Sequence, residues 1–191
     1  MIKSKKELLE YIAQDSKNFK RQLARGGGKC MTNLRSNPIS DQKYIWLYIK
    51  TLRYVEYYDF KKKSNKFYSF VFYYHLKKLR NLSYRTGFQI PPHTCGKGLT
   101  IWHWGPIIVN PAARLGENCT LYPGVLIGHK TFYDAPIIGD NVFIGAGTKI
   151  IGPVKIGDNV TIGQNCVIVN DVPTGSIIVS SPIRCINTRI E

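Results

Sequence analysis

Three histidines in the second half of the chain have the side chains best suited to acid–base chemistry. His93, His103 and His129 each carry an imidazole, which exchanges a proton near neutral pH and can serve as a general base. His103 lies between Trp102 and Trp104, whose aromatic faces could line a pocket and stack on a sugar. No two of these histidines have the close spacing of a zinc site, so we expect no metal.

A six-residue repeat must position these side chains. A unit of this length forms one short strand and a turn, and three units close a triangular coil of about 18 residues. Large aliphatic residues recur at every sixth position in two blocks, and they would point inward and stack on those of the next coil. The pattern predicts a parallel β-helix. The aliphatic positions are Leu115, Leu121, Ile127, Ile138, Ile144, Ile150, Ile156, Ile162 and Ile168.

This repeat resembles the hexapeptide-repeat acyltransferase family over residues 88–186. The resemblance implies a mainly β fold, a left-handed parallel β-helix with an N-terminal α-helical region. It also implies a homotrimer that uses acetyl-CoA as co-substrate, with each site in a cleft between adjacent subunits.

The segment from Gly96 to Gly105 is similar to one in serine acetyltransferases and related polysaccharide O-acetyltransferases, where its His is the catalytic base. Carried over, His103 would take the proton of an acceptor hydroxyl as that oxygen attacks the acetyl thioester. Such a proton transfer typically accelerates a reaction by about 10²–10⁴-fold. Trp102 and Trp104 would then line the acceptor site.

The sequence departs from serine acetyltransferases in two places. In that family an Asp ahead of the catalytic His orients the imidazole, but the stretch from Phe88 to His93 has no carboxylate. A second family His, beyond the loop, falls at Ala135. These departures favour a sugar over L-serine as the acceptor.

One interruption between Ile127 and Ile138 adds five residues to a unit, so we expect a projecting loop. In the family, such loops reach the site of the neighbouring subunit. His129 is therefore the second candidate for a catalytic residue. Gly128 falls where the family uses a backbone N–H to stabilise the oxyanion. An oxyanion donor at Gly128 is therefore the other possible site role in this loop.

The end of the repeat, from Asp171 to Arg184, is similar to the ending common in the family, where coil turns and a final Arg hold acetyl-CoA. The resemblance implies contacts with acetyl-CoA for four residues. Small residues would let the pantetheine approach the backbone, and an Arg suits a phosphate. The four residues are Gly145, Ala146, Gly163 and Arg184.

Nearly all the excess of positive over negative charge lies in the first half of the chain. Residues 1–87 hold 20 Lys and Arg against 6 Asp and Glu, whereas residues 88–191 hold 7 against 6. This asymmetry predicts a boundary near Gly87, between a basic helical region (1–87) and an acyltransferase domain (88–191).

Three helices are expected in the basic region. A capping box from Ser4 to Glu7 opens a short first helix, residues 25–36 form a flexible loop, a second helix starts near Ser40, and a third covers about 66–82. The helices could shield the first coil or attract an anionic acceptor or membrane surface, giving peripheral membrane association. We expect no nucleic-acid partner, because no recognisable module accompanies the charge.

Five widely spaced cysteines without a C-x-x-C pair predict buried or free thiols instead of disulfides. No secretory signal is visible, so we expect a cytoplasmic protein, and the inner face of the membrane is the location we consider within the cytoplasm.

From these features we expect an acetyl-CoA-dependent O-acetyltransferase acting on a sugar hydroxyl of a surface polysaccharide or its precursor, with His103 as general base. Serine O-acetylation in cysteine biosynthesis is the alternative within the enzyme class. A non-catalytic β-helix scaffold is the alternative outside it.

Overall fold

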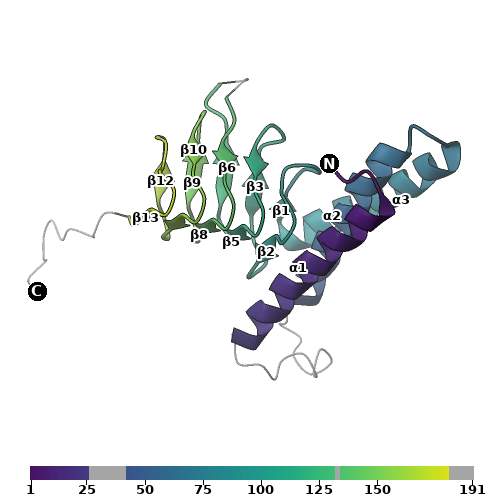
Figure 1. The fold of residues 1–191 in the computed structure, drawn as a ribbon, viewed down its shortest axis with the longest axis horizontal. Helices are drawn as coiled ribbons and strands as arrows, with labels where there is room; N and C mark the ends of the chain where they lie inside the picture. Colours follow the sequence, from purple (N-terminus) through teal and green to yellow (C-terminus); the bar gives the residue numbers. More distant parts are fainter. Residues whose placement is uncertain (26–41, 132–133, 181–191) are drawn as a thin grey trace, which may run out of the picture.

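The computed structural model describes residues 1–25, 42–131 and 134–180. Three long helices lie at one end of a stack of short strands (Figure 1). The helices are α1 (Lys5–Arg25), α2 (Gln42–Lys61) and α3 (Lys66–Thr86). The strands are β1 (Phe88–Gln89), β2 (Thr100–Ile101), β3 (Ile107–Val109), β4 (Arg114–Leu115), β5 (Thr120–Leu121), β6 (Leu126–Gly128), β7 (Ile137–Ile138), β8 (Phe143–Ile144), β9 (Lys149–Ile151), β10 (Lys155–Ile156), β11 (Thr161–Ile162), β12 (Val167–Ile168) and β13 (Ile177–Ile178).

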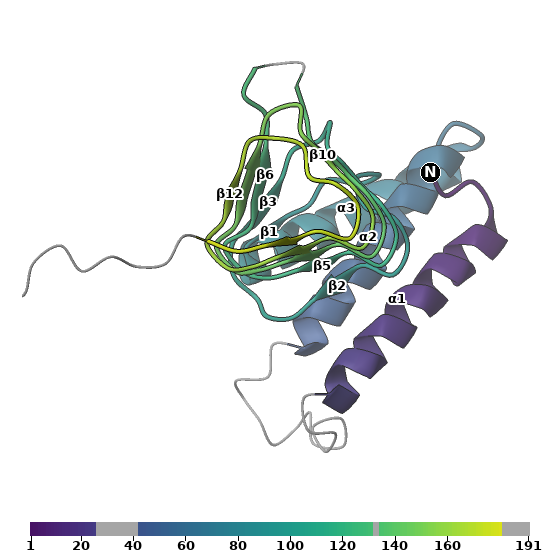
Figure 2. The same ribbon diagram turned by 60° about the vertical axis from the view of Figure 1, so that its left-hand side comes forward.

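The strands form three parallel sheets. Sheet A contains β1, β3, β6, β9 and β12, sheet B contains β4, β7 and β10, and sheet C contains β2, β5, β8, β11 and β13. Seen along the stack, the sheets make the three sides of a triangle (Figure 2). This architecture confirms the predicted class, a mainly β fold with a left-handed parallel β-helix and an N-terminal α-helical region.

The aliphatic residue of each unit points into the triangle, as the repeat predicts. On sheet C, Leu121 pairs with Ile101 of the coil before it and with Ile144 of the coil after it. All three side chains are fully buried. The six-residue spacing therefore builds one continuous column of apolar contacts along the stack.

Asparagines complete the turns because they tolerate a left-handed backbone. Asn118, Asn141, Asn159 and Asn165 have φ between 55° and 57°. The Asn118 amide donates to Asn141 Oδ1 over 3.3 Å, and the Asn141 amide donates to Asn159 Oδ1 over 3.2 Å. This ladder of side chains joins successive coils on the outside of the triangle.

Three of the cysteines are described, and all three are buried and free, as predicted. Burial raises the pKa of the Cys95 thiol to about 11 and that of the Cys119 thiol to about 12, so both stay protonated near neutral pH. Cys166 is the third. Cys30 and Cys185 lie outside the described residues.

The predicted cap of α1 forms with one change: the Glu7 N–H donates to Ser4 Oγ over 3.1 Å, but the Glu7 carboxylate accepts the Lys3 N–H over 2.7 Å, one residue before the expected Ser4 N–H. α1 is longer than the short helix we expected, because its contacts with α2 and with the first coil extend beyond the opening apolar turn. α3 continues to Thr86, and Gly87 ends it with φ of 80°, a conformation that favours glycine. Most of the predicted loop over 25–36 lies outside the described residues.

A buried arginine fastens the helices to the β-helix. Arg53 of α2 is inaccessible to solvent and donates to Asp15 of α1 over 2.8 Å and to Glu56 over 3.0 Å. Its guanidinium also donates to the carbonyls of Cys95 and Gly96, which enter the first full coil. The apolar core likewise runs from α2 and α3 into the coils without a break. None of the described helices is long and apolar enough to cross a membrane.

Candidate functional site

His103 lies on the turn between β2 of sheet C and β3 of sheet A, and it is exposed. The tryptophans on either side of His103 stack on different parts of the molecule. Trp102 stacks on Tyr122 with 5.9 Å between ring centroids, and Trp104 stacks on Tyr44 of α2 at 6.3 Å. The two contacts restrain the backbone on both sides of His103. The imidazole therefore projects from a turn whose position is fixed.

The turns from sheet C to sheet A lie above one another and form one edge of the triangle, which we call the C–A edge (residues 102–106, 122–125, 145–148 and 163–166). Backbone hydrogen bonds join these turns, from the Gly147 N–H to the Pro123 carbonyl over 2.9 Å and from the Asn165 N–H to the Ala146 carbonyl over 2.8 Å. The fold therefore places His103 on the same edge as Gly145, Ala146 and Gly163. Arg184, the fourth predicted acetyl-CoA contact, lies outside the described residues.

Gly145 has a structural role whatever it binds. A Cβ at this position would lie 2.6 Å from the carbonyl carbon of Gly163 and 2.8 Å from the nitrogen of Gln164, closer than real Cβ atoms come. Close packing of successive coils therefore requires glycine at Gly145. Its contact with acetyl-CoA stays a prediction.

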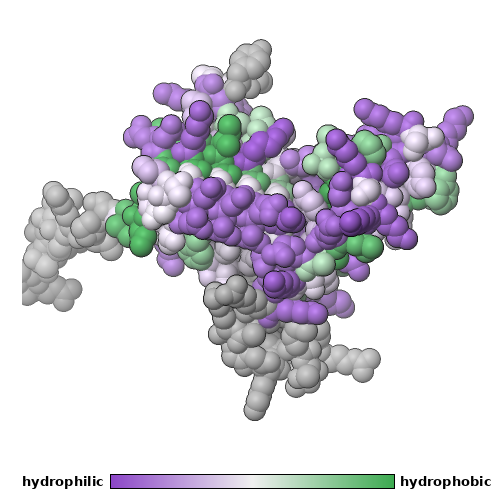
Figure 3. Space-filling model, viewed as in Figure 1, coloured by the Kyte–Doolittle hydropathy of each residue, from purple (hydrophilic) through white to green (hydrophobic). Residues whose placement is uncertain are grey.

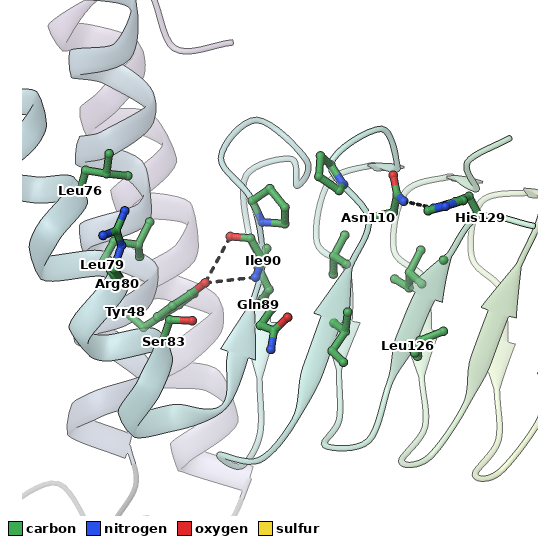
Figure 4. A pocket seen from close by; sticks show the side chains of 16 residues that line it. Tyr48, Leu76, Leu79, Arg80, Ser83, Gln89, Ile90, Asn110, Leu126 and His129 are labelled. Carbon is green, nitrogen blue, oxygen red and sulfur yellow. Dashed lines mark hydrogen bonds between the residues drawn. The ribbon is translucent and has the colours of Figure 1, made fainter. Parts of the chain in front are cut away.

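The turns from sheet A to sheet B form a second edge, the A–B edge, which carries His129 directly after β6 and Asn110 directly after β3. Asn110 Nδ2 hydrogen-bonds to His129 Nδ1 (Figure 4). Asn110 Oδ1 accepts the Ala112 N–H over 2.8 Å, which fixes the orientation of the amide. Sequence reasoning missed Asn110, because its partner lies in the next coil, 19 residues away.

The two candidate histidines are not neighbours within one chain. β3 and β6 are parallel and adjacent in sheet A. His103 precedes the start of β3, whereas His129 follows the end of β6. The two imidazoles therefore lie at opposite edges of sheet A, and only two copies of the chain could bring them together.

A pocket of about 540 Å³ opens on sheet A, between α3 and the A–B edge (Figure 4). Its wall is mainly apolar, and Tyr48 bridges the backbone of Ile90 at its base with two hydrogen bonds of 3.2 Å. Arg80 is the one Lys or Arg in the lining. The lining residues are Tyr48, Leu76, Leu79, Arg80, Ser83, Gln89, Ile90, Pro91, Ile108, Val109, Asn110, Pro111, Leu126, Ile127, Gly128 and His129. The sequence held no signal for Arg80, because a single Arg on a basic helix is usually solvated.

Gly128, the predicted oxyanion donor, is the last residue of β6 and lines the same pocket. It pairs in register with Ile151, and its carbonyl accepts the Gly152 N–H over 3.1 Å. The residue is thus part of the sheet ladder. Its role towards an oxyanion stays a prediction.

The carboxylates nearest the stretch from Phe88 to His93 come from α2. The His93 N–H donates to Glu56 Oε1 over 2.8 Å, and His93 Nε2 lies 3.1 Å from Asp59 Oδ2. These contacts tie His93 to the helices and give it a structural role. Ala135, at the position of the second family His, is half-buried and packs against the apolar core.

A parallel β-helix of six-residue units with a histidine on an exposed edge defines a hexapeptide-repeat transferase. The family model described as bacterial transferase hexapeptide (six repeats) matches residues 135–170. More specifically, the chain belongs to the serine acetyltransferase family. It is 35% identical to the serine acetyltransferase of Helicobacter pylori over 120 residues, which cover 60% of this chain and 70% of that protein. It is 40% identical to the serine acetyltransferase of Staphylococcus xylosus over 101 residues, 51% of this chain and 47% of that protein.

Solved structures agree with this assignment. A serine acetyltransferase of Entamoeba histolytica in complex with cysteine aligns with a TM-score of 0.65 and 25% identity, over 96% of this chain and 62% of that one. A serine acetyltransferase of Neisseria gonorrhoeae in complex with serine aligns with a TM-score of 0.62 and 25% identity, over 91% of this chain and 68% of that one. The chain thus spans less than two thirds of the Entamoeba protein.

These relatives overturn the expected sugar acceptor. Sequence reasoning gave two missing side chains, at the Phe88–His93 stretch and at Ala135, more weight than the rest of the similarity. The relatives at up to 40% identity are serine acetyltransferases, so the prediction of polysaccharide acetylation was wrong. The alternative, serine O-acetylation, is the better supported of the two.

Proposed function

We propose that this protein transfers the acetyl group of acetyl-CoA to the hydroxyl of L-serine, in a site shared between copies of the chain. The observation that carries the proposal is membership of the serine acetyltransferase family. The relative solved in complex with serine supports the choice of acceptor.

In this reaction His103 accepts the proton of the serine hydroxyl as its oxygen attacks the acetyl carbonyl carbon. The new C–O ester bond forms, and the C–S bond of the thioester breaks. The CoA thiolate takes up a proton, and the products are O-acetyl-L-serine and CoA. The exposed position of His103 on a braced turn supports this role, because a base must reach the acceptor without rearranging the turn.

Acetyl-CoA would lie along the C–A edge, where Gly145, Ala146 and Gly163 follow His103 from coil to coil. Small side chains at these turns leave the backbone open to approach. Arg184 would meet a phosphate of the nucleotide. Trp102 and Trp104 would flank the acceptor beside His103.

The site becomes complete when a second copy lays its C–A edge against the A–B edge of the first. His103 of one copy would then face the pocket that holds Asn110 and His129 of its neighbour. A closed ring of three copies would use every such pair of edges, which supports a homotrimer. Arg80 in the pocket would bind the carboxylate of L-serine, since its planar fork suits two parallel hydrogen bonds to a carboxylate.

The acceptor is tested by thiol release from acetyl-CoA with L-serine or with L-alanine, which lacks only the hydroxyl. We expect release with L-serine alone. Arg80→Gln should raise KM for L-serine about tenfold or more and leave kcat nearly unchanged, because the carboxylate contact is equal in the ground and transition states. Thiol release that is no faster with L-serine than with L-alanine would refute the proposal.

A further inference from the structure

α3 exposes a face of aromatic side chains that no described part of the chain covers. Five rings on this helix are at least 60% exposed. They are Phe67 (65%), Phe70 (74%), Tyr73 (64%), Tyr74 (60%) and Tyr84 (82%). The opposite face of α3 packs against α2 through Phe72, Leu79 and Leu82, so the helix has a complete core without these rings.

The exposed rings share one side of the helix. Phe67, Phe70 and Tyr74 follow the i, i+3, i+7 spacing that places residues on a single face. In the space-filling view, apolar side chains lie among hydrophilic ones at the helical end of the molecule (Figure 3). A cluster of exposed rings at one end of a protein marks an interaction surface, because scattered surface residues rarely gather in this way.

The rings share α3 with several positive charges, and the helix itself carries no negative charge. No Asp or Glu occurs in the sequence between Asp59 and Glu117, an interval that contains all of α3. Lys66, Lys77 and Arg85 are exposed on the helix. The partner of this face must therefore be apolar enough to take the rings and acidic enough to take the cations.

We propose that the aromatic face of α3 binds the surface of an anionic lipid bilayer. Phe rings would enter the boundary between headgroups and acyl chains, Tyr rings would sit at the headgroup level, and the Lys and Arg side chains would meet anionic headgroups. The helix would lie in the plane of the interface. The proposal does not depend on the identity of the acetyl acceptor.

A second copy of the chain fits this face less well. A two-fold contact would bring the same face of each copy together, and the cations of one α3 would face those of the other. With no carboxylate on either helix, that repulsion has no local partner to offset it. An anionic bilayer complements both features of the face.

The experiment is co-sedimentation of the full chain with vesicles of phosphatidylcholine alone or of phosphatidylcholine mixed with phosphatidylglycerol in equal parts. We expect binding to the mixed vesicles that weakens as salt is added. The variant with Phe67→Ser, Phe70→Ser and Tyr74→Ser should bind at least tenfold more weakly. Leu9→Ser, which removes an apolar side chain that is 57% exposed on α1, is the control and should bind like the native chain.

Charge is tested separately with two matched double variants. Lys66→Gln with Lys77→Gln should weaken binding to the mixed vesicles about tenfold or more, since each cation near the surface contributes to attachment. Lys5→Gln with Lys6→Gln removes the same charge from exposed positions of α1 and should have a much smaller effect. Equal effects of the two pairs would mean diffuse attraction to the basic region and would overturn the proposal.

Two other results would also overturn it. One is the absence of binding to the mixed vesicles at low salt. The other is a change of oligomeric state in the Phe67, Phe70 and Tyr74 variant, measured by sedimentation equilibrium without lipid, together with unchanged vesicle binding. The face would then be an interface between copies of the chain.

Discussion

Asn110 donates a hydrogen bond from Nδ2 to Nδ1 of His129, and the amide cannot turn over because its Oδ1 already accepts the Ala112 N–H. Nδ1 of His129 must therefore be the acceptor. In the neutral imidazole the proton then resides on Nε2, which makes His129 a hydrogen-bond donor towards the pocket. This arrangement suits a group that donates to the acetyl oxygen in the proposed reaction, in which His103 is the proposed base.

The tautomer of His129 can be observed directly. Long-range proton–nitrogen correlation spectra at neutral pH should show His129 protonated at Nε2 and unprotonated at Nδ1. Asn110→Asp replaces the donor by an acceptor of the same shape, so the proton should move to Nδ1. An Nδ1-protonated ring in the native protein would contradict the arrangement.

Removal of the carboxylate from the buried Arg53 network should destabilise the fold strongly. Asp15→Ala leaves the buried Arg53 guanidinium with Glu56 as its one remaining carboxylate partner, which we expect to lower the free energy of unfolding by about 3–5 kcal/mol. Glu117→Gln is the matched control, because it breaks the ion pair with Lys97 in which both side chains are more than a third exposed. The control should cost no more than about 1 kcal/mol. Similar losses in denaturant unfolding would show that the network does not fasten the helices.

Gly145→Ala separates the structural role of this residue from its predicted contact with acetyl-CoA. Without ligand, the variant should lose about 1–3 kcal/mol of unfolding free energy, because the added methyl group overlaps the backbone of the next coil. Gly128→Ala should lose less, since its nearest neighbour is a flexible Leu126 side chain at 3.3 Å. An unchanged melting temperature for Gly145→Ala, with acetyl-CoA binding lost, would assign the glycine to the ligand alone.

Stability should fall as the pH drops below about 6.5, the ordinary pKa of histidine. His75 stacks against both Tyr54 and Tyr58 at centroid distances of 5.0 and 5.5 Å, and burial, with help from nearby Lys78, lowers its pKa. The unfolded chain then binds the proton more readily than the folded chain, so stability is present above the unfolded pKa and is lost below it.

His75→Phe keeps the stacked ring without the proton. Its melting temperature should therefore vary less than that of the native protein between about pH 7 and pH 5.5. If the melting temperatures of the two proteins change equally with pH, His75 does not contribute to the pH dependence of stability.

The β-helix could be predicted from the sequence because each six-residue unit repeats the same local pattern. The pattern is an aliphatic residue that points inward and a turn residue such as Asn141. Helix starts were predictable for a similar reason, since the capping box from Ser4 to Glu7 is local. The Arg53 network and the contact between Asn110 and His129 were not predictable, because each joins residues far apart in the chain. The acceptor was wrongly predicted from two single positions, whereas substrate recognition depends on a whole pocket.

The role of His103 as general base is tested most directly by the rate of O-acetyl-L-serine formation from acetyl-CoA and L-serine by the native protein and by His103→Ala, with product identified by mass spectrometry. We expect product from the native protein and a loss of about 10²–10⁴-fold in kcat for the variant at an unchanged melting temperature. Product formed at the native rate by His103→Ala, or none formed by the native protein, would contradict it.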